Sequence, residues 1–190
     1  GGWQAFGPMR KVTRSAGNIL YALDDEPALD VYKRYLGDYA RTLPSSGLLF
    51  PFEMFSSAQE SAGLFRTILG IDEAGGSLIL AGDIDPHGYL RLMHAQTDRL
   101  VDGAELAAEA TLKSLAAVPA GGLGLLVSCV GRKLVMGGRA EEEVEAVKHV
   151  LGPKLVLAGF YSYGEISPIS AGVECKLHNQ TMTITFIGED

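Results

Sequence analysis

The segment that decides the fold consists of two apolar runs separated by an amphipathic stretch. It begins with GLLVSC (124–129), continues with RAEEEVEAVKHVLG (139–152) and ends with KLVLAGF (154–160). Apolar residues recur at helical spacing in the middle stretch: Ala140, Val144, Val147 and Leu151. Three glutamates (141–143) fall in its first turn, where negative charge suits the helix dipole. A strand–helix–strand unit of this length predicts a βαβ crossover with two parallel neighbouring strands.

Polar residues follow both of these strands at the point where each one ends. They are Ser128, Cys129, Arg132, Tyr161, Ser162, Tyr163, Gly164 and Glu165. Ligands bind beyond the carboxyl ends of parallel strands in open α/β sheets, so these residues are candidates for one site. Arg132 could hold a carboxylate through two hydrogen bonds, and Glu165 could hold an ammonium group. In the alternative interpretation, Arg132 pairs with Glu165 and the tyrosines only pack against helices.

The flanking sequence predicts further elements on both sides of this unit. Before it, we expect a hairpin at 11–23 that turns at Gly17-Asn18, and then a helix from Pro27 to about Thr42 with its tyrosines mostly in the core. A short strand or bend at 48–52 and a polar loop at 53–62 should follow, and then strands at 64–71, 77–82 and 89–95. A further helix is expected from a capping box at Asp102 to near Pro119, and a hairpin at 172–188 should end the chain. The expected fold class is α/β (α+β mixed). It has a mixed β-sheet with a βαβ core, an antiparallel meander and a C-terminal hairpin, covered by helices. No linker is long enough to split residues 1–190 into independent domains.

The composition argues against several classes of partner. The net charge is −7 and the best basic cluster is only Arg10, Lys11 and Arg14, so a nucleic-acid partner is not expected. No apolar run approaches the roughly 20 residues of a membrane helix, and no signal peptide is recognisable. Two cysteines cannot form the disulfide framework of a small secreted domain. A cytoplasmic setting is therefore expected.

A catalytic or metal-dependent role finds little support in the sequence. Cys129 precedes a glycine and lies near Arg132, which favours a reactive thiol. The candidate bases for it, His149 and His178, stand at no recognisable catalytic spacing. The histidines and cysteines also lack metal-ligand spacing, and GGLG (121–124) precedes a strand instead of joining a strand to a helix. We therefore expect no catalytic residue, no metal and no cofactor.

Five phrases of the chain resemble, in the same order, the C-terminal domain of the FIST (F-box and intracellular signal transduction) family. They are YALDDEPALDVYKRYLG (21–37), LLFPF (48–52), LLVSCVGR (125–132), LAGFYSYGEISP (157–168) and LHNQTMTITFIG (177–188). The resemblance runs from about residue 10 to the end. It implies that residues 1–190 form one such domain, a fragment of a longer chain whose FIST N-terminal half is absent.

The resemblance also implies a function. Such domains are inferred to be sensory modules that bind a small polar ligand, such as an amino acid, and signal to the FIST N-terminal domain and to output domains or proteins. Arg132, Tyr161, Tyr163 and Glu165 are the matched positions for that site. Two alternatives stay open: a recruitment domain without a ligand, whose exposed strand edges could also form a homodimer, and a Cys129-dependent enzyme.

Overall fold

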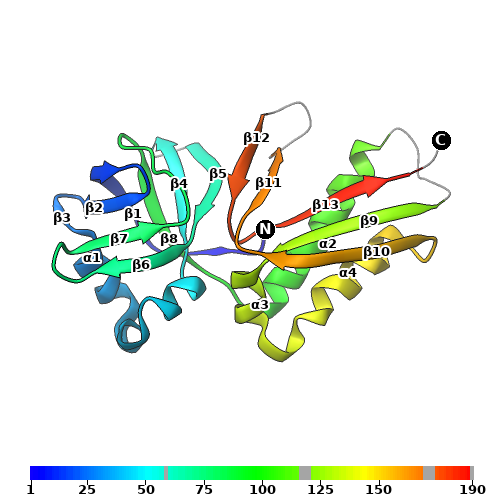
Figure 1. The fold of residues 1–190 in the computed structure, drawn as a ribbon, viewed down its shortest axis with the longest axis horizontal. Helices are drawn as coiled ribbons and strands as arrows, with labels where there is room; N and C mark the ends of the chain where they lie inside the picture. The colour runs from blue at the N-terminus through cyan, green and yellow to red at the C-terminus, as the bar shows by residue number, and fades with distance from the viewer. Residues whose placement is uncertain (58–59, 116–120, 169–173, 189–190) are drawn as a thin grey trace. The chain divides into compact units, whose positions relative to one another are not determined.

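The computed structural model of the chain describes residues 1–57, 60–115, 121–168 and 174–188 (Figure 1). The chain divides into two compact units. Unit 1 comprises Gly1–Trp3 and Ala95–Asp190, and unit 2 comprises Gln4–His94. The expected α/β fold class is confirmed, because the described residues form helices, two antiparallel sheets and one mixed sheet.

Unit 2 is built from one eight-stranded antiparallel sheet and one α-helix. Its elements are β1 (Gln4–Ala16), β2 (Ile19–Leu23), β3 (Glu26–Pro27), α1 (Ala28–Leu36), two 3₁₀ segments (Gly37–Thr42 and Ser45–Leu49), β4 (Phe52–Ser57), β5 (Glu60–Arg66), β6 (Ile68–Asp72), β7 (Ser77–Leu80) and β8 (Tyr89–His94). The strand order is β5-β4-β8-β1-β2-β7-β6, with β3 paired to β2. Apolar side chains of α1 and of the strands form one core, which includes Leu20, Leu29, Tyr32, Ile68, Leu78 and Leu90.

The first hairpin and the start of the helix agree with the sequence, whereas the end of the helix does not. β1 and β2 pair antiparallel on either side of Gly17-Asn18, as predicted. The helix begins directly after Pro27, but its α-helical part ends before Gly37, whose φ of 55° is left-handed. The tighter 3₁₀ turn that follows changes the direction of later side chains. Tyr39 is consequently 54% exposed, and its expected place in the core is wrong.

The polar loop expected at 53–62 is also wrong, because β4 and β5 occupy most of it. Phe52 and Met54 alternate into the core along β4, and this alternation outweighs the polar residues beside them. β8 pairs with β4 and β1 but not with β7. The later strands of unit 2 are therefore antiparallel, as expected, without forming one uninterrupted meander.

Unit 1 contains the predicted βαβ crossover. Its elements are α2 (Thr97–Ser114), β9 (Gly122–Cys129), α3 (Val130–Met136), a 3₁₀ turn (Gly137–Arg139), α4 (Glu141–Leu151), β10 (Leu155–Ser162), β11 (Glu165–Pro168), β12 (Cys175–His178) and β13 (Met182–Ile187). β9 pairs parallel with β10 on one side and antiparallel with β13 on the other. The expectation that the two strands are parallel neighbours is confirmed.

Helices α2 and α4 lie on the same face of this three-stranded sheet (Figure 1). The core between them and the sheet consists of Ala104, Ala108, Leu126, Val147, Leu151, Leu155 and Met182. The inward face of α4 differs from the predicted one at a single position. Val144 is 39% exposed, whereas the side chain of Glu143 is completely buried.

Three further expectations for unit 1 need correction. α2 begins at Thr97, so Asp102 lies inside the helix and cannot cap it, and the predicted end near Pro119 falls outside the described residues. The residues after Cys129 form α3 and not an open turn. The predicted C-terminal hairpin is wrong, because β12 pairs with β11 and β13 pairs with β9. β13 pairs with the free edge of β9, so the last two strands, β12 and β13, belong to different sheets.

Within the described ranges, no helix combines the length and the apolar character needed to cross a membrane.

Candidate functional site

The ends of β9 and β10 bring most of the predicted site residues together. In the parallel register, Tyr161 lies opposite Ser128, and Ser162 lies opposite Cys129. Arg132 follows one turn into α3, and Glu165 begins β11. Gly164 accepts a hydrogen bond from the Ser162 hydroxyl through its carbonyl oxygen (3.1 Å). Tyr163 is the exception, since it is 77% exposed, and its backbone oxygen accepts from the Asn179 side chain at 3.3 Å.

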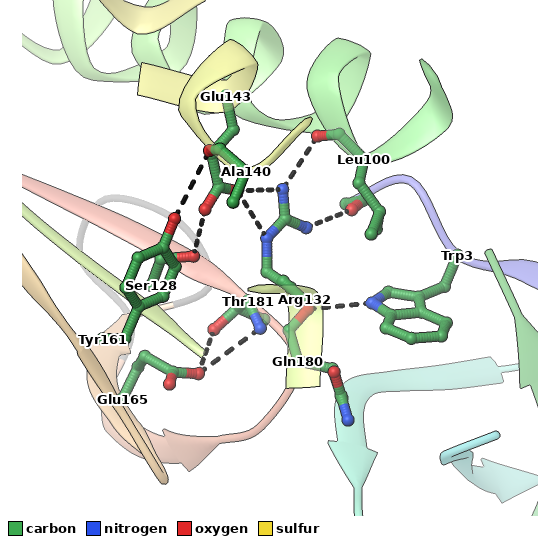
Figure 2. Close-up of polar contacts among 11 residues, drawn as sticks. Trp3, Leu100, Ser128, Arg132, Ala140, Glu143, Tyr161, Glu165, Gln180 and Thr181 are labelled. Carbon is green, nitrogen blue, oxygen red and sulfur yellow. Dashed lines mark hydrogen bonds and ion pairs between the residues drawn. The ribbon is translucent and has the colours of Figure 1, made fainter. Parts of the chain in front are cut away.

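Arg132 is completely buried and is held by protein acceptors (Figure 2). Its Nε and Nη2 donate to Oε2 of Glu143 at 3.1 and 3.0 Å. Nη2 also donates to the Leu100 carbonyl at 2.8 Å, and Nη1 donates to the Gly1 carbonyl at 2.9 Å. The guanidinium therefore pairs with Glu143 and not with Glu165, the partner considered from the sequence.

Glu143 is a central residue of the site, and the interpretation of the sequence missed it. The acidic run 141–143 was attributed to the helix dipole, which explains exposed glutamates only. A usable signal was present, because Glu143 lies three residues after Ala140 and four before Val147, on the buried stripe of α4. A glutamate at such a position needs a partner, since a buried unpaired carboxylate is strongly disfavoured. Arg132 and Ser128 supply the partners.

Two hydroxyl groups surround the Glu143 carboxylate. The Ser128 Oγ donates to Oε1 of Glu143 at 2.8 Å. The Tyr161 hydroxyl donates to the carbonyl oxygen of Ala140 at 3.4 Å (Figure 2). Burial, and then the negative charge of Glu143, raise the pKa of Tyr161 to about 12. The phenol is therefore protonated at neutral pH and is available for hydrogen bonding.

A pocket of about 240 Å³ opens beside these groups. It is lined by residues of β9, β10, β13 and α4, namely Leu126, Ser128, Glu143, Val144, Leu157, Ala158, Gly159, Phe160, Tyr161 and Met182. Most of the lining is apolar, and the polar groups come from Ser128, Glu143 and Tyr161. Arg132 does not line this pocket.

Glu165 forms a second buried polar centre at the start of β11. Its Oε1 accepts from the Ser162 hydroxyl at 3.0 Å, and its Oε2 accepts from the Thr181 hydroxyl at 2.9 Å and from the Thr181 amide at 3.3 Å. Burial raises the pKa of the Glu165 carboxyl, although these hydrogen bonds oppose the shift. Among the described residues Glu165 makes no salt bridge, so a neutral carboxyl is favoured more than in water.

Cys129 is packed and protonated at this junction. Its side chain is buried, and burial followed by the nearby charge of Glu165 raises the pKa of the thiol. A thiol with a raised pKa is a poor nucleophile. Of the two candidate bases, His178 is buried and bonded to the Ser167 carbonyl (2.9 Å), and His149 lies in the last turn of α4. In the part of the chain that the structure describes, no group of three or more His, Cys, Asp or Glu could hold a metal ion.

The phrases SCVGR and HNQT pack against each other. A Cβ at Gly131 would lie only 2.3 Å from the side-chain nitrogen Nε2 of Gln180, so a larger residue here would have to displace that side chain. Gln180 is itself buried, with a left-handed φ of 61°, and its carbonyl accepts from Trp3 Nε1 at 2.9 Å. Residues 178–180 are all buried, and Gln180 packs against the start of α3.

Comparison with known proteins gives the class of this protein: the chain contains a domain of a signal transduction family. The family model that matches is described as the FIST C domain, and it covers residues 28–168. The chain belongs to this family, which confirms the resemblance seen in the sequence. The matched residues run from the first residue of α1 in unit 2 to the end of β11 in unit 1. No curated protein and no solved structure matches the chain.

Proposed function

We propose that this domain is the sensory part of a signal transduction protein and that it binds a small ligand in the pocket of unit 1. One observation carries the proposal. The pocket of about 240 Å³ lies along β10, and its polar end includes Ser128 and Tyr161, next to the carboxyl ends of the parallel pair β9 and β10. Such strand ends are where open α/β sheets bind ligands. The volume lies below the 300–1,000 Å³ of pockets for drug-sized molecules, which favours a small ligand.

The roles proposed for the individual residues follow from their contacts. Ser128 and Tyr161 line the pocket and would contact the ligand, whereas the buried Glu143 carboxylate fixes the Ser128 hydroxyl. Arg132 is a positioning residue, because it holds Glu143 in place and its nitrogens are bonded to protein oxygens. Glu165 and Ser162 support the strand ends from the adjacent buried centre. We assign no catalytic role to Cys129, because its thiol is buried and protonated.

A signalling mechanism requires that the ligand favour one state of the domain over another. The pocket wall combines β10 with α4, so a bound molecule would fix α4 against the sheet. We propose that this change is passed to a FIST N-terminal domain and to output domains or proteins in a cytoplasmic setting. The energetic scale is sufficient, since a ligand at 100 times its Kd stabilises the folded state by about 2.7 kcal/mol.

The test is a thermal-shift screen with small amines, amino acids, alcohols and carboxylic acids. Val144→Phe places a larger side chain at the pocket wall, and Val156→Phe is the matched control, because Val156 is an exposed valine of β10 that does not line the pocket. We expect at least one compound to raise the Tm of the wild type and of Val156→Phe but not that of Val144→Phe. Absence of any shift, or an equal shift in Val144→Phe, would contradict the proposed site.

A further inference from the structure

We propose that the pocket selects a ligand with a hydrogen-bond donor at its polar end, an amine on a short apolar body, and that Ser128 and Tyr161 determine this specificity. The inference rests on the proposed function, since it names the chemical class that the same pocket would take. It departs from the expectation drawn from the sequence, in which Arg132 holds a carboxylate.

The polar end of the pocket presents acceptors. The Ser128 hydroxyl gives its proton to Glu143 (2.8 Å), so its oxygen faces other partners as an acceptor. The Tyr161 hydroxyl gives its proton to the Ala140 carbonyl (3.4 Å), which leaves its oxygen as an acceptor as well. The Glu143 carboxylate is completely buried and fixes the Ser128 proton, so it acts on a ligand through Ser128. The two hydroxyl oxygens that line the pocket can therefore receive hydrogen bonds.

The donors nearest to these acceptors are used elsewhere. The Arg132 guanidinium donates through all three of its nitrogens, to Glu143, Leu100 and Gly1, and it does not line the pocket. A ligand carboxylate would have to draw the Ser128 proton away from Glu143, or the Tyr161 proton away from Ala140, and leaving those acceptors unmatched disfavours binding. An ammonium group carries three donors and would meet both hydroxyl oxygens as they stand.

The charges around Tyr161 favour the same choice. Glu143 and Glu141 both raise the pKa of the phenol, and only Arg132 opposes them. Lys133 is a nearby cation that does not line the pocket, and its Nζ lies 4.8 Å from the centre of the Tyr161 ring. This contact shows that the ring accepts an ammonium group on its face. Lys133 could also attract an acid, so the experiment includes it.

The apolar walls define the remainder of the ligand. Leu126, Leu157 and Met182 line the pocket away from its polar end, and its volume of about 240 Å³ accommodates a short branched alkyl chain or a small ring. Affinity should rise roughly fourfold for each additional methylene that becomes buried, until the pocket is full.

The experiment compares four probes with one branched alkyl body: 3-methylbutylamine, 3-methylbutanol, 4-methylpentanoate and leucine. Their affinities for the full chain are measured at pH 7 by ligand-observed NMR, with Val144→Phe as the blocked control. The amine should bind best and the carboxylate at least tenfold more weakly. Tyr161→Phe and Ser128→Ala should each weaken the amine severalfold and leave the carboxylate unchanged.

The outcomes separate the inference from the proposed function. A carboxylate that binds as tightly as the amine overturns the inference, and loss of that binding in Lys133→Met would identify Lys133 as the determinant. If none of the four probes binds, but another compound shifts the wild type and not Val144→Phe, the inference fails and the proposed function stands. If no compound binds at all, both fail. Preferential amine binding that Val144→Phe abolishes supports both.

Discussion

Replacement of Arg132 by methionine tests whether the buried ion pair is structural. Arg132→Met leaves the Glu143 carboxylate buried without its cationic partner, and it removes the donor to the Leu100 and Gly1 carbonyls. Loss of one partner of a buried pair costs about 3–5 kcal/mol. Because whole domains are stable by only about 5–15 kcal/mol, this is a large fraction of the total.

The same reasoning gives a different result for the double variant. In Arg132→Met/Glu143→Met both charges are removed together, and replacement of a buried pair by apolar residues is often neutral or stabilising. We therefore expect the double variant to be more stable than either Arg132→Met or Glu143→Met, and the two single losses not to add.

Urea unfolding followed by tryptophan fluorescence is a suitable assay. Trp3 is the single tryptophan of the chain and belongs to unit 1, so its emission reports the unit that holds the pair. With an m-value of about 2 kcal/mol/M, the single variant should lower the midpoint by about 1.5–2.5 M. Arg139→Met is the matched control: Arg139 pairs with Glu142 and Asp98 at the exposed surface, where solvent screens the charges, so little change is expected.

The account of this pair would be refuted by either of two results. One is a double variant whose loss equals the sum of the two single losses, which would mean that Arg132 and Glu143 contribute independently. The other is an Arg132→Met variant no less stable than Arg139→Met, which would leave Arg132 free to serve a ligand directly.

Two further predictions concern Glu165 and the two cysteines. Burial raises the pKa of Glu165 above its ordinary 4.5, so its contribution to stability is fully present below pH 4.5 and is lost as the pH rises through the folded-state pKa. The non-titrating variant Glu165→Gln should therefore gain in unfolding free energy relative to the wild type between pH 4 and pH 7, and a constant difference in urea titrations would contradict this. Cys175 is exposed and Cys129 is buried with a raised thiol pKa, so iodoacetamide should modify Cys175 rapidly and Cys129 only in urea. Mass spectrometry of Cys175→Ser gives the control, and rapid labelling of that variant under native conditions would show that Cys129 is accessible.

The sequence was sufficient for elements whose signal is local. The parallel pair β9 and β10 follows from two apolar runs around one amphipathic helix, and this predicts that both strand ends share one edge, where the structure pairs Ser128 with Tyr161. The family phrases likewise pointed to residues that do contact one another, such as Gly131 and Gln180.

Features that depend on distant partners could not be predicted in this way. The partner of β13 is β9, which lies far away in the sequence, while the local pattern favoured a hairpin with β12. α3 has only seven residues, too few to show a helical period. Arg132 pairs with Glu143 and not with Glu165, and this depends on how α4 is rotated against the sheet. The pocket depends on how the side chains around that helix pack.

The most direct test of the central claim is to map a bound molecule onto the isotope-labelled chain by amide chemical shifts. With the best compound from the screen, the account predicts the largest saturable shifts at Ser128, Glu143, Val144 and Tyr161, which line the pocket, and small ones in unit 2. Saturable shifts centred on residues of unit 2, with the β10 and α4 amides unchanged, would contradict it.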